Sequence, residues 1–184
     1  QKIRSLPNWQ KDYPAFAWCT SLGNGWYLPA RDELKAIYAQ CAAINNTLKA
    51  KGKPELGGYH WSSTQHSKFY AWYVLMDNGG TRNYIKIASN YVRAVSAFGG
   101  PKTSAPYKIG DYYNDGTKEG IVFEISNGGY SGKIVSLEQK KCKWSEKQVI
   151  TDATSQTDGM YNMQKIRSLS NWQNDYPAFA WCAS

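Results

Sequence analysis

The sequence predicts an α+β fold with two main helices and several short antiparallel strands. One observation is the helical spacing of apolar residues between Leu34 and Leu48. A second is a series of segments between residues 59 and 98 that are rich in aromatic and β-branched residues. A third is a further set of strand-like segments after residue 107, separated by turns rich in Asn and Gly.

The two predicted helices have recognisable starts. Asp32 and Glu33 occupy the first turn of the longer one, where the helix dipole favours negative charge. Its apolar face is formed by Leu34, Ile37, Tyr38, Cys41, Ile44 and Leu48. The other helix begins around Asp12, because Pro14 is tolerated at an early helical position.

Strand propensity and turn residues predict the remaining elements. The hairpin turn is expected at Asp77-Asn78-Gly79-Gly80. The predicted strands cover residues 59–64, 69–76, 81–87, 91–98, 107–112, 121–125 and 133–137. Residues 140–147 are expected to form a charged loop and 151–158 an irregular segment, and a further helical segment is expected to begin at Tyr161.

The chain contains an internal repeat. Residues 1–21 recur as residues 164–184, an offset of 163 residues (164 − 1), and the copies differ at three positions, Pro7/Ser170, Lys11/Asn174 and Thr20/Ala183. This period is far longer than the roughly 20–50 residues of solenoid units. It indicates an array of whole domains, or one module cut at an unusual place.

A Gly- and Pro-containing segment at residues 99–106 has the composition of a linker. We therefore expect residues 1–98 to be the larger, C-terminal part of one domain and residues 107–184 the N-terminal part of the next repeat. Each part alone would expose a sheet edge, so each needs a complement. The linker is short for folding 107–184 back onto 1–98, which favours head-to-tail association with other copies into a fibre or tandem array.

The composition suits one domain, or one and a part, with an aromatic core. The chain has 184 residues, of which 15% are aromatic, and a formal net charge of +8. Such a charge could attract acidic glycans, anionic surfaces or nucleic acid, but solvated lysines are the simpler interpretation, and no nucleic-acid partner is expected. No apolar run approaches the ~20 residues of a membrane span.

Four short motifs occur in order along residues 26–95. They are W-x-L-P with Trp26, Leu28 and Pro29 just before the longer predicted helix, W-S-S-T from Trp61, A-W with Trp72, and V-R-x-V with Arg93. This order resembles the C-type-lectin-like domains at the C-terminus of the Legionella collagen-like adhesin and in Fibrobacter major paralogous and Bacteroidetes surface repeats. The resemblance implies a C-type-lectin-like fold, a location outside the cell or on its surface, and structural roles for those six residues. We expect Trp26, Leu28, Leu34, Ile37, Trp61 and Val92 to be buried together.

No catalytic or metal-binding pattern is recognisable. His60 and His66 match no zinc spacing, Ser62 and Ser63 lack a nucleophile elbow, and Asn114-Asp115-Gly116 is more simply a turn than a calcium loop. The calcium-dependent sugar motifs of animal C-type lectins are absent, and so is the reactive Cys pair of the related formylglycine-generating enzyme. We therefore expect no metal, no cofactor and no enzymatic activity.

The cysteines leave their state open. Cys19, Cys41 and Cys142 make three per period, because Cys182 repeats Cys19. An odd number in a surface protein allows an intermolecular bridge or a free thiol, while buried unpaired thiols are equally compatible.

Exposed aromatic residues are the remaining candidates for ligand binding. Tyr70, Tyr73 and Tyr84 are predicted to form a surface that binds carbohydrate or another surface protein without calcium. Two functions compete: a structural repeat that assembles head to tail with its own copies, and a calcium-independent adhesin domain that binds glycan or matrix.

Overall fold

The computed structural model describes residues 25–99 and 105–183. The repeated copy at residues 1–21, with the helix expected near Asp12 and with Cys19, lies outside these residues, as does most of the predicted linker. We call residues 25–99 the first part, residues 105–183 the second part, and the junction between them the seam.

Sheet A is antiparallel and draws strands from both parts. Its order is β1-β6-β9-β8-β7. The strands are β1 (Trp26–Tyr27), β6 (Val95–Gly99), β9 (Ser131–Val135), β8 (Glu119–Ser126) and β7 (Tyr112–Asn114). In β8, the residues from Gly120 to Phe123 are all buried, so this strand is covered on both faces.

Sheet B has the order β10-β5-β2-β3-β4. Its strands are β10 (Lys140–Lys143), β5 (Ser89–Val92), β2 (Tyr59–Gln65), β3 (Tyr70–Leu75) and β4 (Thr81–Ile85). β2 and β5 are parallel, with His60 opposite Tyr91. The predicted hairpin turn between β3 and β4 is confirmed: Gly79 has a φ of 73° and donates its N–H to the Leu75 carbonyl at 2.8 Å.

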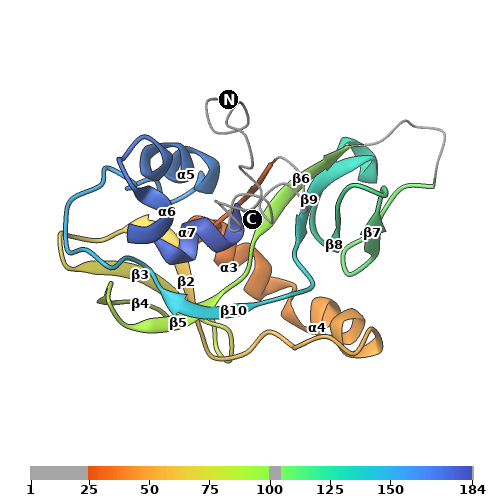
Figure 1. Ribbon diagram of the computed structural model, residues 1–184. Coiled ribbons are helices and arrows are strands. Elements are labelled where there is room, and N and C mark those ends of the chain that lie inside the picture. Colours follow the sequence, from red (N-terminus) through yellow and green to blue (C-terminus); the bar gives the residue numbers. More distant parts are fainter. Residues whose placement is uncertain (1–24, 100–104, 184) are drawn as a thin grey trace.

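The predicted apolar helix is two consecutive helices, α3 (Arg31–Ala39) and α4 (Cys41–Ala50). Its apolar face is confirmed, because Leu34, Ile37, Ile44 and Leu48 are all buried. The break falls at Gln40, whose φ of −109° and ψ of 12° are not helical. α3 contacts β2 and β3 of sheet B and β8 of sheet A, so it lies between the two sheets (Figure 1).

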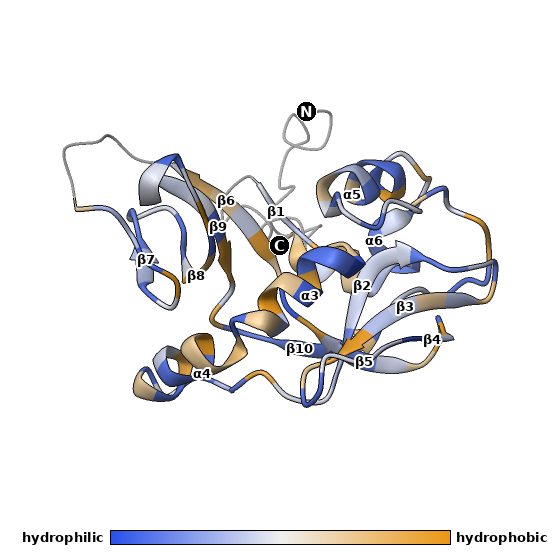
Figure 2. Ribbon diagram, turned by 180° about the vertical axis from the view of Figure 1, so that it is seen from behind, coloured by the Kyte–Doolittle hydropathy of each residue, from blue (hydrophilic) through white to orange (hydrophobic). Residues whose placement is uncertain are grey.

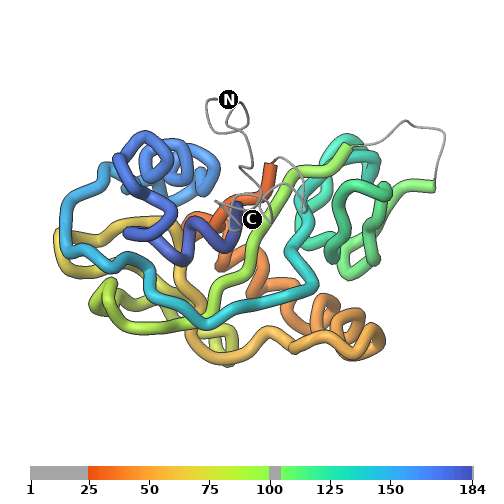
Figure 3. The backbone as a smooth tube through the Cα atoms, viewed as in Figure 1, coloured from red at the N-terminus to blue at the C-terminus, as the bar shows by residue number. Residues whose placement is uncertain are grey.

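The second copy of the repeat contributes α5 (Gly159–Arg167), α6 (Trp172–Asp175) and α7 (Pro177–Cys182). Asp158 caps α5 by accepting a hydrogen bond from the Tyr161 N–H at 2.8 Å. Figure 3 shows the C-terminal end of the chain returning to β1, which α7 contacts. A short 3₁₀ turn at Asn127–Gly129 connects β8 to β9.

One hydrophobic core spans the seam. β9 of the second part pairs with β6 of the first, and β10 pairs with β5, so each part supplies the sheet edge that the other lacks. Hydrophobic positions gather on β6, β9 and α3 (Figure 2). The predicted common burial is confirmed for Trp26, Leu28, Leu34, Ile37, Trp61 and Val92, each no more than 4% exposed.

The prediction of two main helices with short antiparallel strands is wrong. The described residues form two five-stranded sheets with short helices of four to ten residues, and one strand pair is parallel. The cause is that strands of both parts join into continuous sheets while Gln40 divides the longest helix. The C-type-lectin-like fold with two main helices, which the resemblance of the four motifs implied, is corrected to a mixed α+β fold built on two five-stranded sheets.

Three predicted segments also differ. Residues 91–98 were expected to be one strand, but Arg93 and Ala94 separate β5 from β6 where the chain crosses from sheet B to sheet A. Residues 107–112 turn at Gly110, so β7 begins only at Tyr112. The expected charged loop begins with strand β10, because residues 140–143 pair with β5.

Candidate functional site

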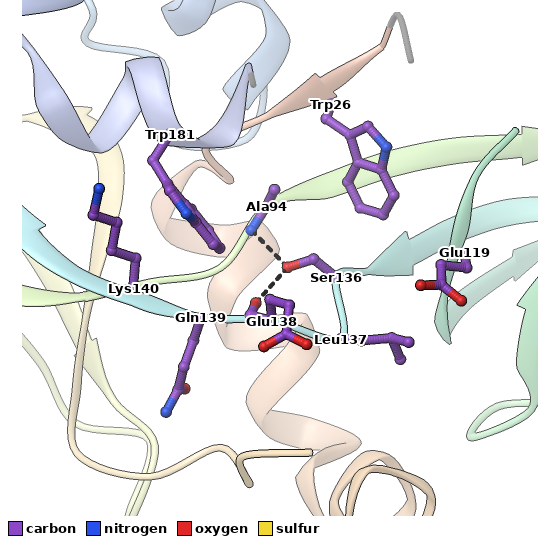
Figure 4. A pocket seen from close by; sticks show the side chains of 9 residues that line it. All are labelled: Trp26, Ala94, Glu119, Ser136, Leu137, Glu138, Gln139, Lys140 and Trp181. Carbon is purple, nitrogen blue, oxygen red and sulfur yellow. Dashed lines mark hydrogen bonds between the residues drawn. The ribbon is translucent and has the colours of Figure 1, made fainter. Parts of the chain in front are cut away.

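A cleft of about 330 Å³ opens at the seam. Trp26 comes from β1, Ala94 from the crossing between the sheets, and Trp181 from α7. The remaining lining residues are Glu119, Ser136, Leu137, Glu138, Gln139 and Lys140 (Figure 4). Two indoles therefore share a largely apolar cleft with two carboxylates, an amide and an ammonium group, and neither part of the chain forms it alone.

The polar wall of the cleft is held by hydrogen bonds. Ser136 accepts the Ala94 N–H at its Oγ (3.1 Å) and donates to the Glu138 carbonyl (2.9 Å), as Figure 4 shows. Glu138 forms an ion pair with Lys53 at 2.5 Å. At the opposite side, Glu119 accepts a hydrogen bond from the Tyr112 hydroxyl at 2.6 Å. These contacts orient both carboxylates before any ligand arrives.

Arg93 supports this wall from beneath. Its side chain is 1% exposed and donates to the carbonyls of Ser136 (2.8 Å), Leu137 (3.0 Å) and Pro54. Its Nε also donates to the Gln139 side chain at 3.3 Å. Burial lowers the pKa of Arg93 to about 10. The arginine of the V-R-x-V motif thus ties the β9–β10 connection to the first part.

The other motif residues also join elements. The Pro29 carbonyl accepts the Ser63 N–H at 2.8 Å, and the Arg31 N–H donates to Thr64 Oγ1 at 3.0 Å. The W-x-L-P segment is therefore bonded directly to the W-S-S-T strand. Trp72 is half-buried, with the Arg31 guanidinium 5.4 Å from its ring centroid.

The three tyrosines predicted to form a binding surface are not brought together. Tyr70 and Tyr84 are exposed, at 42% and 52%. Tyr84 lies opposite Ala71, the neighbour of Tyr70, so strand alternation directs the Tyr70 and Tyr84 side chains to opposite faces of sheet B. Tyr73 is buried, with its ring 5.2 Å from that of Tyr59 and 6.2 Å from that of Trp61.

Apart from Trp26, which was expected to have a structural role, the cleft residues were not identified from the sequence. Trp181 belongs to the repeated segment, which was the one available signal. Glu119 and residues 136–140 lie in segments without a distinctive pattern, and they reach Trp26 only through the pairing of β6 with β9.

Within residues 25–99 and 105–183, no group of three or more His, Cys, Asp or Glu residues is placed to hold a metal ion. His60 is fully buried and His66 packs its ring 4.9 Å from that of Trp72. Cys41, Cys142 and Cys182 are free thiols. Burial raises the pKa of Cys142 to about 12 and that of Cys182 well above its usual value, which keeps these two thiols protonated.

None of the helices in the described residues has the length and apolar character needed to cross a membrane.

Comparison with known proteins places the first part of the chain. The model of the family described as the Lcl C-terminal domain matches residues 4–96, which include all four motifs. No curated protein and no solved structure matches the chain. The match supports the resemblance to the Legionella adhesin domain and an adhesin-like, surface-associated class, but does not extend to the Fibrobacter and Bacteroidetes repeats. The chain belongs to the Lcl C-terminal domain family.

Proposed function

We propose that this domain is a non-catalytic attachment module outside the cell, and that it binds carbohydrate in the seam cleft without a metal or cofactor. The observation that carries the proposal is the cleft itself, in which the half-buried Trp181 shares the lining with Glu119, Glu138 and Gln139, and with the buried Trp26. The adhesin-like character of the family supports the same class of function.

The chemistry of the lining fits a sugar. An indole offers an apolar surface for the C–H face of a pyranose ring, while carboxylate and amide oxygens accept hydrogen bonds from its hydroxyls. The cleft of about 330 Å³ lies at the small end of the roughly 300–1,000 Å³ range of ligand pockets. A ligand of one or two sugar rings, such as the end of a glycan chain, matches that size.

A glycan array with and without EDTA tests the proposal, followed by titration of the best ligand. Trp181→Ala should weaken binding by about tenfold or more, which is about 1.4 kcal/mol. Trp172→Ala is the matched control, because that indole lies in the same repeated segment but does not line the cleft. Tyr70→Ala and Tyr84→Ala should leave the affinity unchanged.

Two results would contradict metal-independent binding in the seam cleft. Loss of binding in EDTA would mean that a metal ion is required. If Tyr70→Ala or Tyr84→Ala lowers the affinity and Trp181→Ala does not, the ligand binds at the exposed aromatic residues of sheet B. No binding to any glycan would favour the second candidate function.

The second candidate is a structural repeat that assembles head to tail, with domains divided as 1–98 and 107–184. The observation that favours it is the seam, where β9 and β10 of the second part complete sheets begun by β6 and β5 of the first. The same pairings could form between the second part of one copy and the first part of another. Light scattering over a concentration series should then show species larger than one chain, whereas a monomer at every concentration contradicts assembly.

A further inference from the structure

Helices α6 and α7 occupy a built site on the second part and β1. The Phe179 ring lies 4.9 Å from that of Trp144 and the Tyr176 ring 5.9 Å, both edge to face. Ala178, Phe179 and Cys182 are completely buried. α7 contacts both β10, the edge strand of sheet B, and β1, the edge strand of sheet A, so it bridges the two sheets.

Polar contacts fix the same segment. The Asp175 carbonyl accepts hydrogen bonds from the Glu146 N–H at 2.6 Å and the Ser145 hydroxyl at 3.0 Å. The Asp175 carboxylate accepts one from Lys147 Nζ at 2.6 Å. The site therefore selects an aspartate followed by tyrosine, and a phenylalanine three residues beyond that tyrosine.

The chain contains a second segment with the same side chains. Residues 9–19 repeat residues 172–182 with one difference, Lys11 in place of Asn174. Asn174 is exposed, so this difference does not change the side chains that the segment buries in the site. The buried residues of the segment all have identical counterparts, namely Asp12, Tyr13, Ala15, Phe16 and Cys19 for Asp175, Tyr176, Ala178, Phe179 and Cys182.

The first copy is connected to β1 by a short segment, close to the α6–α7 site. Residues 20–25 join Cys19 to β1, and six extended residues span at most about 20 Å. In the structure, α7 contacts β1, and Trp181 lines the same cleft as Trp26. The length of this connection allows a segment that precedes β1 to reach the α6–α7 site of the same chain.

Helix α5 anchors the second copy at the site. The second copy follows α5, whose Asn162 donates to Ser63 Oγ at 2.9 Å and to the Ser155 carbonyl at 2.7 Å. The α5 anchor therefore favours residues 172–182 in the site.

We propose that the α6–α7 site is an exchange site, which residues 9–19 of the same chain enter in place of Trp172–Cys182. The displaced segment then becomes available to the equivalent site of a second copy of this chain. This second step rests on the head-to-tail assembly proposed above, and the exchange within one chain does not.

A cycle of full-length variants tests the exchange by thermal unfolding. Phe179→Ala alone should lower the unfolding midpoint by no more than about 3 °C, because Phe16 takes the place of Phe179, and Phe16→Ala alone should leave it unchanged. The double variant should lose about 10 °C or fail to fold, since neither segment then fills the site. Phe123→Ala is the control, because this buried residue has no counterpart in the repeat and should show the full loss alone.

The opposite pattern overturns the exchange. If Phe179→Ala is as unstable as the double variant, or does not fold by itself, residues 9–19 do not enter the site. Light scattering separates the second step: Phe16→Ala should abolish self-association of the wild-type chain, because no segment is then displaced. A non-additive cycle in a protein that stays monomeric retains the exchange and rejects the assembly.

Discussion

The seam is built differently in the two sheets. In sheet A it is a backbone ladder, with β6 and β9 in register from Val95 opposite Val135 to Gly99 opposite Ser131. In sheet B the β5–β10 ladder is reinforced by buried side chains around Trp144, whose indole N–H donates to the Ser62 carbonyl at 2.8 Å. Both ladders carry buried side chains, but only sheet B adds the Trp144 indole hydrogen bond, so loss of Trp144 should weaken the seam of sheet B more than that of sheet A.

Sheet B also places a buried lysine in its part of the seam. Lys86 is completely buried and donates to Gln65 Oε1 at 2.7 Å and to the Val149 carbonyl at 2.8 Å. Its Nζ lies 4.6 Å from the Trp144 ring centroid, and burial lowers the pKa of Lys86 to about 7. In sheet A, the carboxylate of Glu33 connects Tyr27 of β1 and Lys133 of β9 with the start of α5. The following predictions test this contrast, from the largest expected effect to the smallest.

Trp144→Ala should cost about 3–5 kcal/mol of unfolding free energy, because it opens a cavity in sheet B and leaves the Ser62 carbonyl without its donor. Urea unfolding followed by circular dichroism measures the loss. Trp172→Ala, at a half-buried indole, is the control and should cost about 1 kcal/mol or less. Equal losses in the two variants would show that Trp144 does not secure the seam.

The stability of sheet B should fall with acid through His60. Burial, and then the nearby charge of Arg93, lower the pKa of His60 to about 4. The unfolded chain has a His pKa of about 6.5. Between pH 6.5 and 4, the unfolded chain therefore binds a proton on this imidazole and the folded chain does not. Stability should therefore decline across that window by about 3 kcal/mol and lose no more from this group below it.

Urea unfolding at pH 7 and pH 4.5 checks this expectation. The wild-type protein should lose about 2–3 kcal/mol more between the two conditions than His60→Phe, because the variant has no group that titrates there. An identical pH dependence in both proteins would assign the acid sensitivity to other residues.

Glu33→Gln should cost about 2 kcal/mol. One carboxylate oxygen accepts from the Tyr27 hydroxyl (2.8 Å) and Lys133 Nζ (3.0 Å), and the other from the N–H groups of Ala30 (2.9 Å) and Gly159 (3.0 Å). The amide of glutamine turns one of these acceptors into a donor that faces two donors. Glu55→Gln, on an exposed side chain, should change the urea midpoint little, and a similar change in both would refute this role.

The smallest effect compares two fully buried tryptophans. Trp144→Phe should cost about 1 kcal/mol more than Trp61→Phe, because Trp144 loses the hydrogen bond to Ser62 whereas the Trp61 Nε1 has no partner within the described residues. The difference between the two urea midpoints measures it. Equal losses would mean that packing alone accounts for both side chains.

Local patterns in the sequence determined several features correctly. The apolar spacing from Leu34 to Leu48 identified the buried helical face, Asp77–Gly80 identified the hairpin, and the motif tryptophans Trp26 and Trp61 were placed in the core. Each depends on neighbours within a few positions: a helix repeats its face every 3.6 residues, a turn needs a residue that tolerates positive φ, and large apolar side chains avoid water.

Only the tertiary structure determined which strands and side chains are neighbours. Strand alternation could not tell that Tyr73 would be covered by Tyr59 and Trp61 while Tyr84 stayed exposed, because burial depends on which partner lies over each face. The crossing at Arg93, the strand at Lys140–Lys143 and the cleft between Trp26 and Trp181 all follow from pairing across the seam. That pairing joins segments tens of residues apart, and a local pattern carries no information about the register between them.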